Sequence, residues 1–165
     1  MSRKMKAKEI SKDNFTEYGQ VHNMLDKEAA GFGNGLFTFY RDSVRYCAAS
    51  PNMGLSTLSV ARDGKFQIMA LEHHNYTAEI MMPMDDDMVL CLAKSGSEAE
   101  PCREDLEAFI VPRYTMVHLN PGVWHYMPLP MHKTEVNVLV VLPERAYHND
   151  LSSVDMSEKE LFIEI

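Results

Sequence analysis

Short hydrophobic runs separated by turn residues occupy most of the chain after residue 50. Their length, and the alternation of apolar with polar positions in several of them, is typical of β-strands rather than helices. We expect strands at residues 55–61, 66–74, 77–82, 88–93, 107–111, 115–119, 123–126 and 135–142. No long helical pattern lies between them, so the sequence predicts an all-β protein built as an antiparallel barrel or sandwich.

The two ends of the chain carry weaker signals. Residues 11–14 can cap a short N-terminal helix that carries Phe15 and Tyr18 on one side and stops at Gly19. Before it, residues 1–12 are basic and lead into no apolar segment, so we expect a frayed tail rather than a signal peptide. The run 160–165 ends apolar and predicts a strand that docks on the barrel or on a partner subunit.

The glycine-rich stretch at residues 31–35 superficially resembles a nucleotide-binding loop. It has neither of the usual glycine spacings and no clear strand before it, so we interpret it as a flexible loop. No repeat, linker or low-complexity segment divides the chain, which predicts a single domain spanning 1–165. At 45% hydrophobic residues, such a domain can bury a real core.

Charge and cysteine content narrow the classes of partner. A net charge of −8 argues against nucleic acid, because proteins that bind the phosphate backbone present a positive face. The apolar stretches are too short to span a bilayer, so no membrane partner is expected. Cys47, Cys91 and Cys102 show no zinc-type spacing and cannot all pair, which indicates reduced thiols and a cytoplasmic protein.

Polar residues interrupt one otherwise apolar strand face. In the strand expected at 66–74, Glu72 and His74 continue a face that begins apolar, and Glu79 follows in the next strand. If that face lines the barrel, these groups need a partner or a metal near its mouth. The alternative, charges exposed at a strand end, stays open.

A second group of candidates surrounds a predicted turn. Pro121 and Gly122 suit the central positions of a type II turn, and a two-residue loop would place His118 opposite His125. A slip of one residue would separate the two histidines. Trp124, beside His125, is either a pocket wall or a core anchor. Asn137 lies inside an apolar strand and therefore needs a hydrogen-bond partner, which we expect in the pocket.

These two groups resemble the metal-binding motifs of cupins. The spacing Glu72-x-His74-x4-Glu79 is similar to the first cupin motif, HxHx4E, with Glu in place of the first His. The stretch 122–125 satisfies the GxxH of the second motif, although Leu129 stands where its Asn is expected.

Over nearly its whole length the chain resembles the ureidoglycolate lyases, a family of small cupin-like enzymes. The likeness rests on Phe15-x-x-Tyr18-Gly19, Arg62, Leu71-Glu72-His73-His74, Pro83, residues 106–110, Trp124-His125 and Pro128-Leu129. It departs from the family at Asn75, Glu79, Tyr126 with the inserted Met127, and Asn137, where family members usually have Pro, Gln, His and Asp. These changes fall in the expected pocket, so they bear on the substrate more than on the fold.

The resemblance implies a cupin-like antiparallel β-barrel of the double-stranded β-helix type that splits ureidoglycolate into glyoxylate and urea, a step of purine (allantoin) breakdown. A base removes the hydroxyl proton, the carbon–nitrogen bond breaks, and an acid protonates the departing nitrogen. We expect catalytic roles for Glu72, His118 and His125, substrate contacts from Arg62, Trp124, Tyr126 and Asn137, and a metal site of Glu72, His74, Glu79 and His125. Arg62 would hold the carboxylate of the small acid.

The ligand set would suit one divalent ion, nickel, zinc, manganese or iron. Two other functions stay open on the sequence. One is a metal-dependent cupin isomerase or oxygenase, and the other is a non-catalytic cupin that binds a small acid, favoured by Tyr126 in place of the motif histidine. A homodimer is expected, because edge strands and termini of this fold can pair across a two-fold axis.

Overall fold

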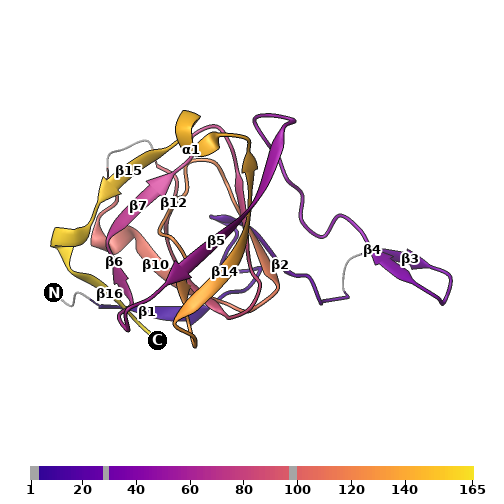
Figure 1. The fold of residues 1–165 in the computed structure, drawn as a ribbon, viewed down its shortest axis with the longest axis horizontal. Coiled ribbons are helices and arrows are strands. Elements are labelled where there is room, and N and C mark those ends of the chain that lie inside the picture. The colour runs from indigo at the N-terminus through magenta and orange to yellow at the C-terminus, as the bar shows by residue number, and fades with distance from the viewer. Residues whose placement is uncertain (1–3, 28–29, 97–99) are drawn as a thin grey trace.

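Two β-sheets curl around a common apolar interior, and a two-stranded arm projects from them (Figure 1). The computed structural model describes residues 4–27, 30–96 and 100–165. Its strands are β1 (Lys4–Glu9), β2 (Gly19–Asn23), β3 (Gly31–Gly33), β4 (Thr38–Tyr40), β5 (Met53–Ala61), β6 (Gln67–Ile68), β7 (Ala70–His73), β8 (Glu79–Pro83), β9 (Met88–Ala93), β10 (Leu106–Val111), β11 (Thr115–Leu119), β12 (Trp124–His125), β13 (Leu129–Pro130), β14 (Glu135–Pro143), β15 (Ser152–Asp155) and β16 (Leu161–Glu164). The described helices are α1 (Ala146–Asn149) and two single 3-10 turns, Arg103–Asp105 and Ser157–Lys159.

The all-β, cupin-like class is therefore confirmed. One sheet has nine strands, ordered β15-β7-β12-β9-β10-β1-β16-β6 with β13 also on β9, and the other has five, ordered β2-β11-β8-β14-β5. The expected strands 88–93 and 115–119 appear with those bounds, and the others differ by a few residues. Two pairings are parallel rather than antiparallel, those of β1 with β10 and with β16.

Alternation of side chains explains why these runs form the five-stranded sheet. On β14, Val136, Val138 and Val140 are buried on one face, while Asn137 and Leu139 lie half-buried on the other. Because directly paired residues share a face, Val117 of β11 and Met81 of β8 join the buried set. This inner face meets the nine-stranded sheet across the core.

The expected N-terminal helix is wrong, although its buried side is correct. Residues 12–18 form turns, because the Ser11 hydroxyl and the Asn14 side chain bond each other's backbone N–H groups and satisfy the chain locally. Phe15 and Tyr18 are nevertheless buried and pack with Phe109, with ring centroids 5.4–5.6 Å apart.

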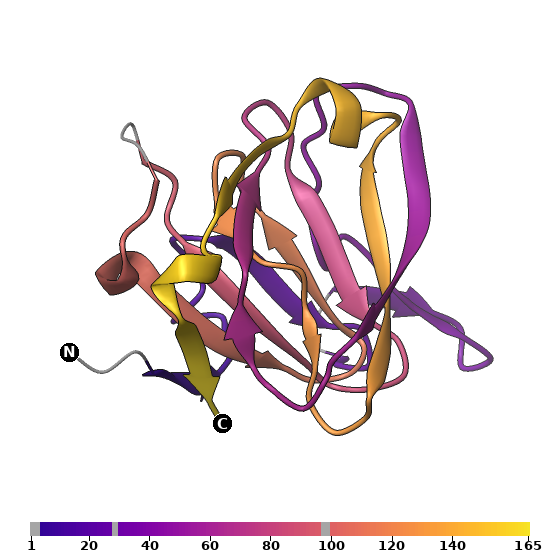
Figure 2. The same cartoon turned by 60° about the vertical axis from the view of Figure 1, so that its left-hand side comes forward.

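The interpretation of the chain start as a frayed tail is also wrong for the residues that the structure describes. Lys4–Glu9 forms β1, inserted between β10 and β16, and only Met5 and Ala7 of this strand are buried. Lysines at its other positions hide this alternation within a basic run. Residues 1–3 lie outside the described part of the chain. The prediction that the last run docks on the barrel is confirmed, since β16 pairs with β1 and β6 (Figure 2).

Residues 31–35 are not a plain loop but the first half of the β3–β4 arm, which projects away from the barrel (Figure 1). Phe32 pairs directly with Phe39 across the arm, and their ring centroids lie 5.7 Å apart. Phe32, Leu36, Phe37 and Phe39 all remain more than half exposed. No helix among the described residues combines the length and the apolar run that a membrane crossing requires.

Candidate active site

Four titratable side chains from both sheets converge at one end of the barrel. Glu72 of β7 pairs in register with His125 of β12, and His74 follows directly after β7. Glu79, the first residue of β8, approaches from the five-stranded sheet. We call these four residues the Glu–His cluster.

One carboxylate oxygen lies at the centre of this cluster. Glu79 Oε2 is 3.2 Å from His74 Nε2 and 3.1 Å from His125 Nε2. His125 Nε2 also lies 3.5 Å from Glu72 Oε1. His74, Glu79 and His125 are buried, whereas the Glu72 side chain is 43% exposed. The cluster therefore has three buried members and one that solvent or a ligand reaches.

Backbone carbonyls orient both histidine rings. His74 Nδ1 bonds the carbonyl oxygen of Asp150, and His125 Nδ1 bonds that of Val123 at 3.1 Å. A carbonyl can only accept, so each Nδ1 must carry the proton and donate it. Each Nε2 is thereby aimed at Glu79, the arrangement typical of histidines that bind a metal or exchange a proton.

Burial and charge act in opposite directions on these groups. Burial would raise the pKa of Glu79, but the histidine beside it, His125, and then His74 outweigh that effect and lower the pKa. Burial would likewise lower the pKa of His125, yet the Glu79 carboxylate raises it, with a further contribution from Glu72. The pKa of His74 is raised too, because its contacts with the Glu79 carboxylate and the Asp150 carbonyl outweigh its burial. The Glu79 carboxylate therefore favours the protonated form of both imidazoles, and they in turn favour its charged form.

The same residues fit a divalent metal. Donor atoms of Glu72, His74 and His125 all lie within 4.8 Å of one another. Although Glu79 Oε2 and His125 Nε2 are close, neither makes a hydrogen bond of good angular geometry, so both present unsatisfied buried atoms toward the cluster. Imidazole nitrogens and carboxylate oxygens are common ligands of zinc, nickel, manganese and iron. The cluster could therefore hold one ion.

A cavity of ≈ 390 Å³ opens onto this cluster. Glu72, His74 and Glu79 line one part of it, and its rim comes from β5, the end of β14, and the segment that carries α1. Such a volume suits a small molecule. A second, mostly apolar cavity of ≈ 260 Å³ contains Glu72, His125 and Tyr126 together with Met69 and Met127.

The predicted pairing of His118 with His125 is wrong. The type II turn does form, with Gly122 at φ +80° and Val123 N–H donating to Asn120 O. The strands beside it nevertheless diverge, since β11 joins β2 and β8 while β12 joins β7 and β9. Type II turns do not match the twist of a tight hairpin, which is the physical reason for the divergence.

His118 consequently lies outside the cluster. It pairs with Ile80, the neighbour of Glu79 on β8, and therefore shares the opposite face of the sheet from Glu79. There it is buried against Tyr46, whose ring centroid is 5.8 Å away.

Two predicted substrate contacts are structural instead. The Arg62 guanidinium donates to the carbonyl oxygens of Pro130 and Met131 and stacks on Phe66, with 4.0 Å between its carbon and the ring centroid. Arg62 directly follows the last residue of β5. The cavity is lined from the opposite end of that strand, which begins near Gly54. Asn137 does find the hydrogen-bond partner that its position requires, but that partner is Asp85, outside the pocket.

Trp124 and Tyr126 lie on either side of His125 in the chain but differ in position. Trp124 packs against His73 in a tilted arrangement, with ring centroids 4.0 Å apart, and lines a separate depression with Tyr18 and Lys94. Neighbouring residues of a strand point to opposite faces, so Trp124 cannot share the face of His125. Tyr126 is buried and borders the apolar cavity beside Glu72 and His125.

The sequence reasoning missed the segment that closes this end of the barrel. The Asp150 carboxylate accepts hydrogen bonds from the N–H groups of Asn75 and Tyr76 at 2.7 and 2.8 Å, while its carbonyl holds His74. Arg145 lines the cavity from the same segment. No motif spacing marks Asp150 or Arg145. Both lie far along the chain from Glu72 and reach the site only because the segment after β14 folds back over this end of the barrel.

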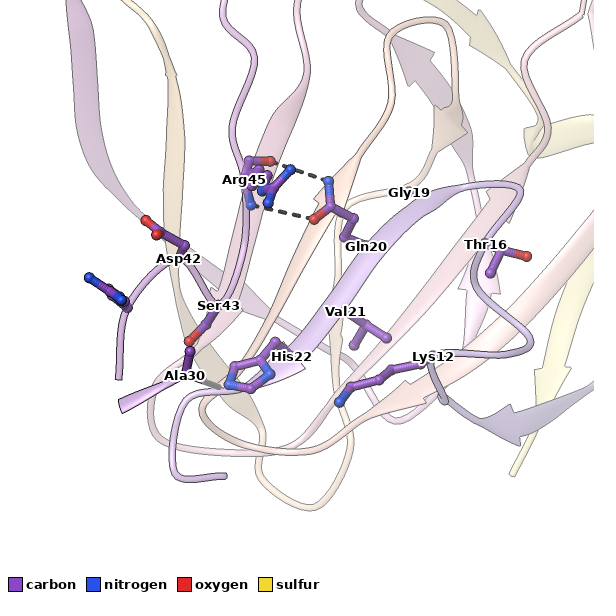
Figure 3. Close-up of a pocket in the computed structure, with 11 residues that line it drawn as sticks. Lys12, Thr16, Gly19, Gln20, Val21, His22, Ala30, Asp42, Ser43 and Arg45 are labelled. Carbon is purple, nitrogen blue, oxygen red and sulfur yellow. Dashed lines mark hydrogen bonds between the residues drawn. The ribbon is translucent and has the colours of Figure 1, made fainter. Parts of the chain in front are cut away.

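A larger hollow of ≈ 730 Å³ lies away from the cluster, between β2 and residues 41–45 (Figure 3). Gln20 holds its wall together through two hydrogen bonds with the Arg45 backbone. Its lining includes Lys12, His22 and Arg41 but none of the Glu–His cluster. Size alone therefore does not identify the reactive site.

Comparison with known proteins gives a consistent result. Residues 2–164 match the family described as ureidoglycolate lyase. A ureidoglycolate lyase of Salmonella typhimurium (strain LT2) is 24% identical over 157 residues, which cover 94% of this chain and 97% of that protein. Proteins of the same name from Salmonella paratyphi B (strain SPB7) and Salmonella newport (strain SL254) are each 23% identical over the same share of both chains.

Proposed function

Because the chain belongs to the ureidoglycolate lyase family, we propose that it cleaves ureidoglycolate to glyoxylate and urea at the Glu–His cluster. The observation that carries this proposal is the convergence of two carboxylates and two oriented imidazoles beside a cavity of suitable size, which Glu72, His74 and Glu79 line. Cleavage of a carbon–nitrogen bond beside a hydroxyl group needs one base and one acid, which this cluster contains.

In this proposal, Glu72 is the base and His125 the acid. Glu72 is the carboxylate that solvent reaches, so it can accept the hydroxyl proton of the substrate. As the carbonyl of glyoxylate forms, the electron pair of the breaking bond moves to the ureido nitrogen. The imidazolium of His125 gives that nitrogen its proton, and urea leaves. Solvent then returns a proton to His125 and removes one from Glu72.

Glu79 and His74 position the acid. Glu79 contacts both imidazoles through one oxygen and favours the protonated form of His125. His74 is fixed by the Asp150 carbonyl and contacts the Glu79 carboxylate, as His125 does. Removing the Glu79 charge would leave His125 buried without its counter-charge, which costs several kcal/mol.

The test is an assay of urea and glyoxylate release from ureidoglycolate by the wild type and by Glu72→Gln and His125→Asn. We expect each substitution to lower kcat by about 10²- to 10⁴-fold, the range for loss of general acid–base catalysis. Glu135→Gln, at an exposed position at the start of β14, is the matched control and should retain full activity. Full activity of Glu72→Gln would overturn its role, and a wild type without turnover would overturn the proposed function.

We also propose that the cluster binds one divalent metal, supported by its donor set. Glu72, His74, Glu79 and His125 would hold it through deprotonated atoms, so bound metal is an alternative to the acid and base roles of His125 and Glu72. It would supply Lewis-acid polarisation of a substrate oxygen. Elemental mass spectrometry on protein purified without an affinity tag tests this. Near-stoichiometric metal that disappears in a His74→Ala, His125→Ala double variant supports the proposal. Metal-free protein from metal-replete cells contradicts it and leaves the acid–base proposal intact.

We further propose that the protein acts in the cytoplasm as a homodimer. The exposed apolar side chains of the β3–β4 arm support self-association, because an isolated two-stranded hairpin is marginally stable in water. The acidic net charge and the free thiols of Cys47, Cys91 and Cys102 are compatible with a reducing compartment.

A further inference from the structure

The cavity beside the Glu–His cluster is lined by more acidic side chains than lysines and arginines. Glu72, Glu79 and Glu144 line it, and Arg145 is the one lysine or arginine among its lining residues. The imidazole of His74 is engaged with the Glu79 carboxylate, so a substrate carboxylate needs a further cation to offset Glu72 and Glu144. Arg62, the cation that the sequence favoured, is committed to backbone carbonyls elsewhere.

Arg145 is held in place at the rim by both ends of its segment. On one side, Glu144 N–H donates to Asn52 O at 2.9 Å. On the other, α1 ends at Asp150, which is bonded to Asn75, Tyr76 and His74. The segment that carries Arg145 is thus fastened to the same residue that orients a histidine of the cluster.

The backbone of Arg145 is strained. Its φ of 65° and ψ of 19° lie in the left-handed region, which costs a residue with a Cβ about 1–2 kcal/mol. Such strain persists where the surroundings enforce it and is concentrated at ligand sites. A glycine would adopt this conformation more easily, so a glycine substitution removes the side chain without adding backbone strain.

The guanidinium is available to a ligand. Among the described residues it forms an ion pair through Nε with Glu144 Oε1 at 3.4 Å, and the two side chains are 70% and 62% exposed. Such an exposed pair is weak, and it leaves the two terminal nitrogens free to donate. A planar guanidinium binds a carboxylate through two parallel hydrogen bonds, which a lysine cannot do.

We infer that Arg145 binds the substrate carboxylate at the rim of the cavity and thereby determines specificity for small acids. The inference rests on the proposed lyase function for the identity of the substrate. With the carboxylate on Arg145, the hydroxyl and ureido groups enter the same cavity, which Glu72 lines and beside which His125 lies 3.5 Å from Glu72 Oε1. The residue fixes which end of the substrate enters first.

The experiment compares ureidoglycolate with its carboxamide, in which the acid is replaced by a neutral amide. We expect Arg145→Gln to raise KM for the acid about 10- to 100-fold, as for a lost charged hydrogen-bond pair, with a smaller change in kcat. The wild-type preference for acid over amide should collapse in this variant, whereas a merely structural defect would affect both compounds alike. Arg145→Lys should be intermediate, and Arg113→Gln, an exposed arginine outside the cavity, is the matched control.

Two further variants guard against misfolding and test the competing ion pair. Arg145→Gly relieves the left-handed backbone and should fold while losing the preference for the acid. Glu144→Gln should tighten binding of the acid about two- to threefold, because it removes the exposed competitor.

Calorimetric titration with glyoxylate separates this inference from the proposed function. If the wild type binds glyoxylate and Arg145→Gln does not, Arg145 is the carboxylate site whether or not ureidoglycolate is cleaved. If the wild type cleaves ureidoglycolate and Arg145→Gln keeps its KM and its acid preference, the assignment of Arg145 is overturned while the function stands. A wild type that neither cleaves ureidoglycolate nor binds glyoxylate overturns both.

Discussion

His118 is a buried histidine whose ring nitrogens make no hydrogen bond with the described residues. It lies against Tyr46 on the outer face of the five-stranded sheet, opposite to the face that carries Glu79. Burial lowers its pKa, so the folded protein holds this ring neutral. A polar side chain without a partner at such a position is a cost to the fold rather than a contribution to catalysis.

We therefore predict that His118→Leu stabilises the protein, increasingly so at acidic pH. Because the pKa of His118 is lowered on folding, the unfolded chain binds more protons below about pH 6.5, and wild-type stability falls as the pH drops. The variant lacks this contribution. Urea unfolding should show a gain of about 1 kcal/mol at pH 8 that widens toward pH 5.

The control for this prediction is Met116→Leu, two residues earlier on the same face of β11. It removes no titratable group, so its effect on the free energy of unfolding should not vary with pH. A gap between wild type and His118→Leu that stays constant from pH 8 to pH 5 would show that His118 does not titrate on unfolding.

At the scale of single residues, the sequence predicted the cluster better than the contacts around it. Glu72, His74 and Glu79 lie within eight residues across one strand connection, so their spacing alone brings them together. Its motif also placed His125 in this group, but the pairing of β12 with β7 that brings it there was not predicted. The destinations of Arg62 and Arg145 depend on packing between distant segments, and no local pattern encodes that.

At the scale of elements, β2 shows how one glycine sets a strand pairing. Gly19 begins β2 with φ +152° and pairs with Leu119 of β11. A Cβ placed on it would lie 1.8 Å from the backbone carbonyl oxygen of His118. The sequence correctly marked Gly19 as a boundary but predicted a helix before it, since capping residues and paired aromatics occur in turns as well.

Gly19→Ala should therefore be much more damaging than Gly64→Ala. Gly64 also has a positive φ, +95°, but no atom lies within 4 Å of its Cβ position, so only the backbone conformation is penalised. We expect Gly64→Ala to lower the free energy of unfolding by about 1 kcal/mol and Gly19→Ala by more than about 3 kcal/mol. Thermal and urea unfolding measure both variants. If Gly19→Ala and Gly64→Ala lost the same stability, the close approach of β2 to β11 would be contradicted.

The other elements that the sequence missed are either very short or lie in segments without a recognisable hydrophobic pattern. The strand β1 is hidden in a basic run, and β3 and β4 have three residues each. Apart from β1, the strands of six or more residues, β5, β9, β10 and β14, were all anticipated because they alternate or run apolar long enough to be distinguished from loops.

At the scale of the whole molecule, the β3–β4 arm provides the test of self-association. Leu36 is 93% exposed at its tip, and Phe37 and Phe39 are about half exposed. If a second copy covers the arm, sedimentation equilibrium should give a dimer for the wild type and a monomer for a Leu36→Ser, Phe37→Ser, Phe39→Ser variant. Leu55→Ser, an exposed residue of β5 outside the arm, controls for lost hydrophobicity. A monomeric wild type, or a triple variant that remains dimeric, would contradict the role of the arm.

The Glu–His cluster also joins the two sheets mechanically. Glu79 belongs to the five-stranded sheet, and Glu72 and His125 belong to the nine-stranded one. An ion or small acid bound there therefore cross-links the two sheets. The sheets cannot separate at this end without releasing it. A ligand at a free concentration of 100 times its dissociation constant adds about 2.7 kcal/mol to the free energy of unfolding. Amide hydrogen exchange in β7, β8 and β12 should then slow together, far beyond the residues that the ligand touches.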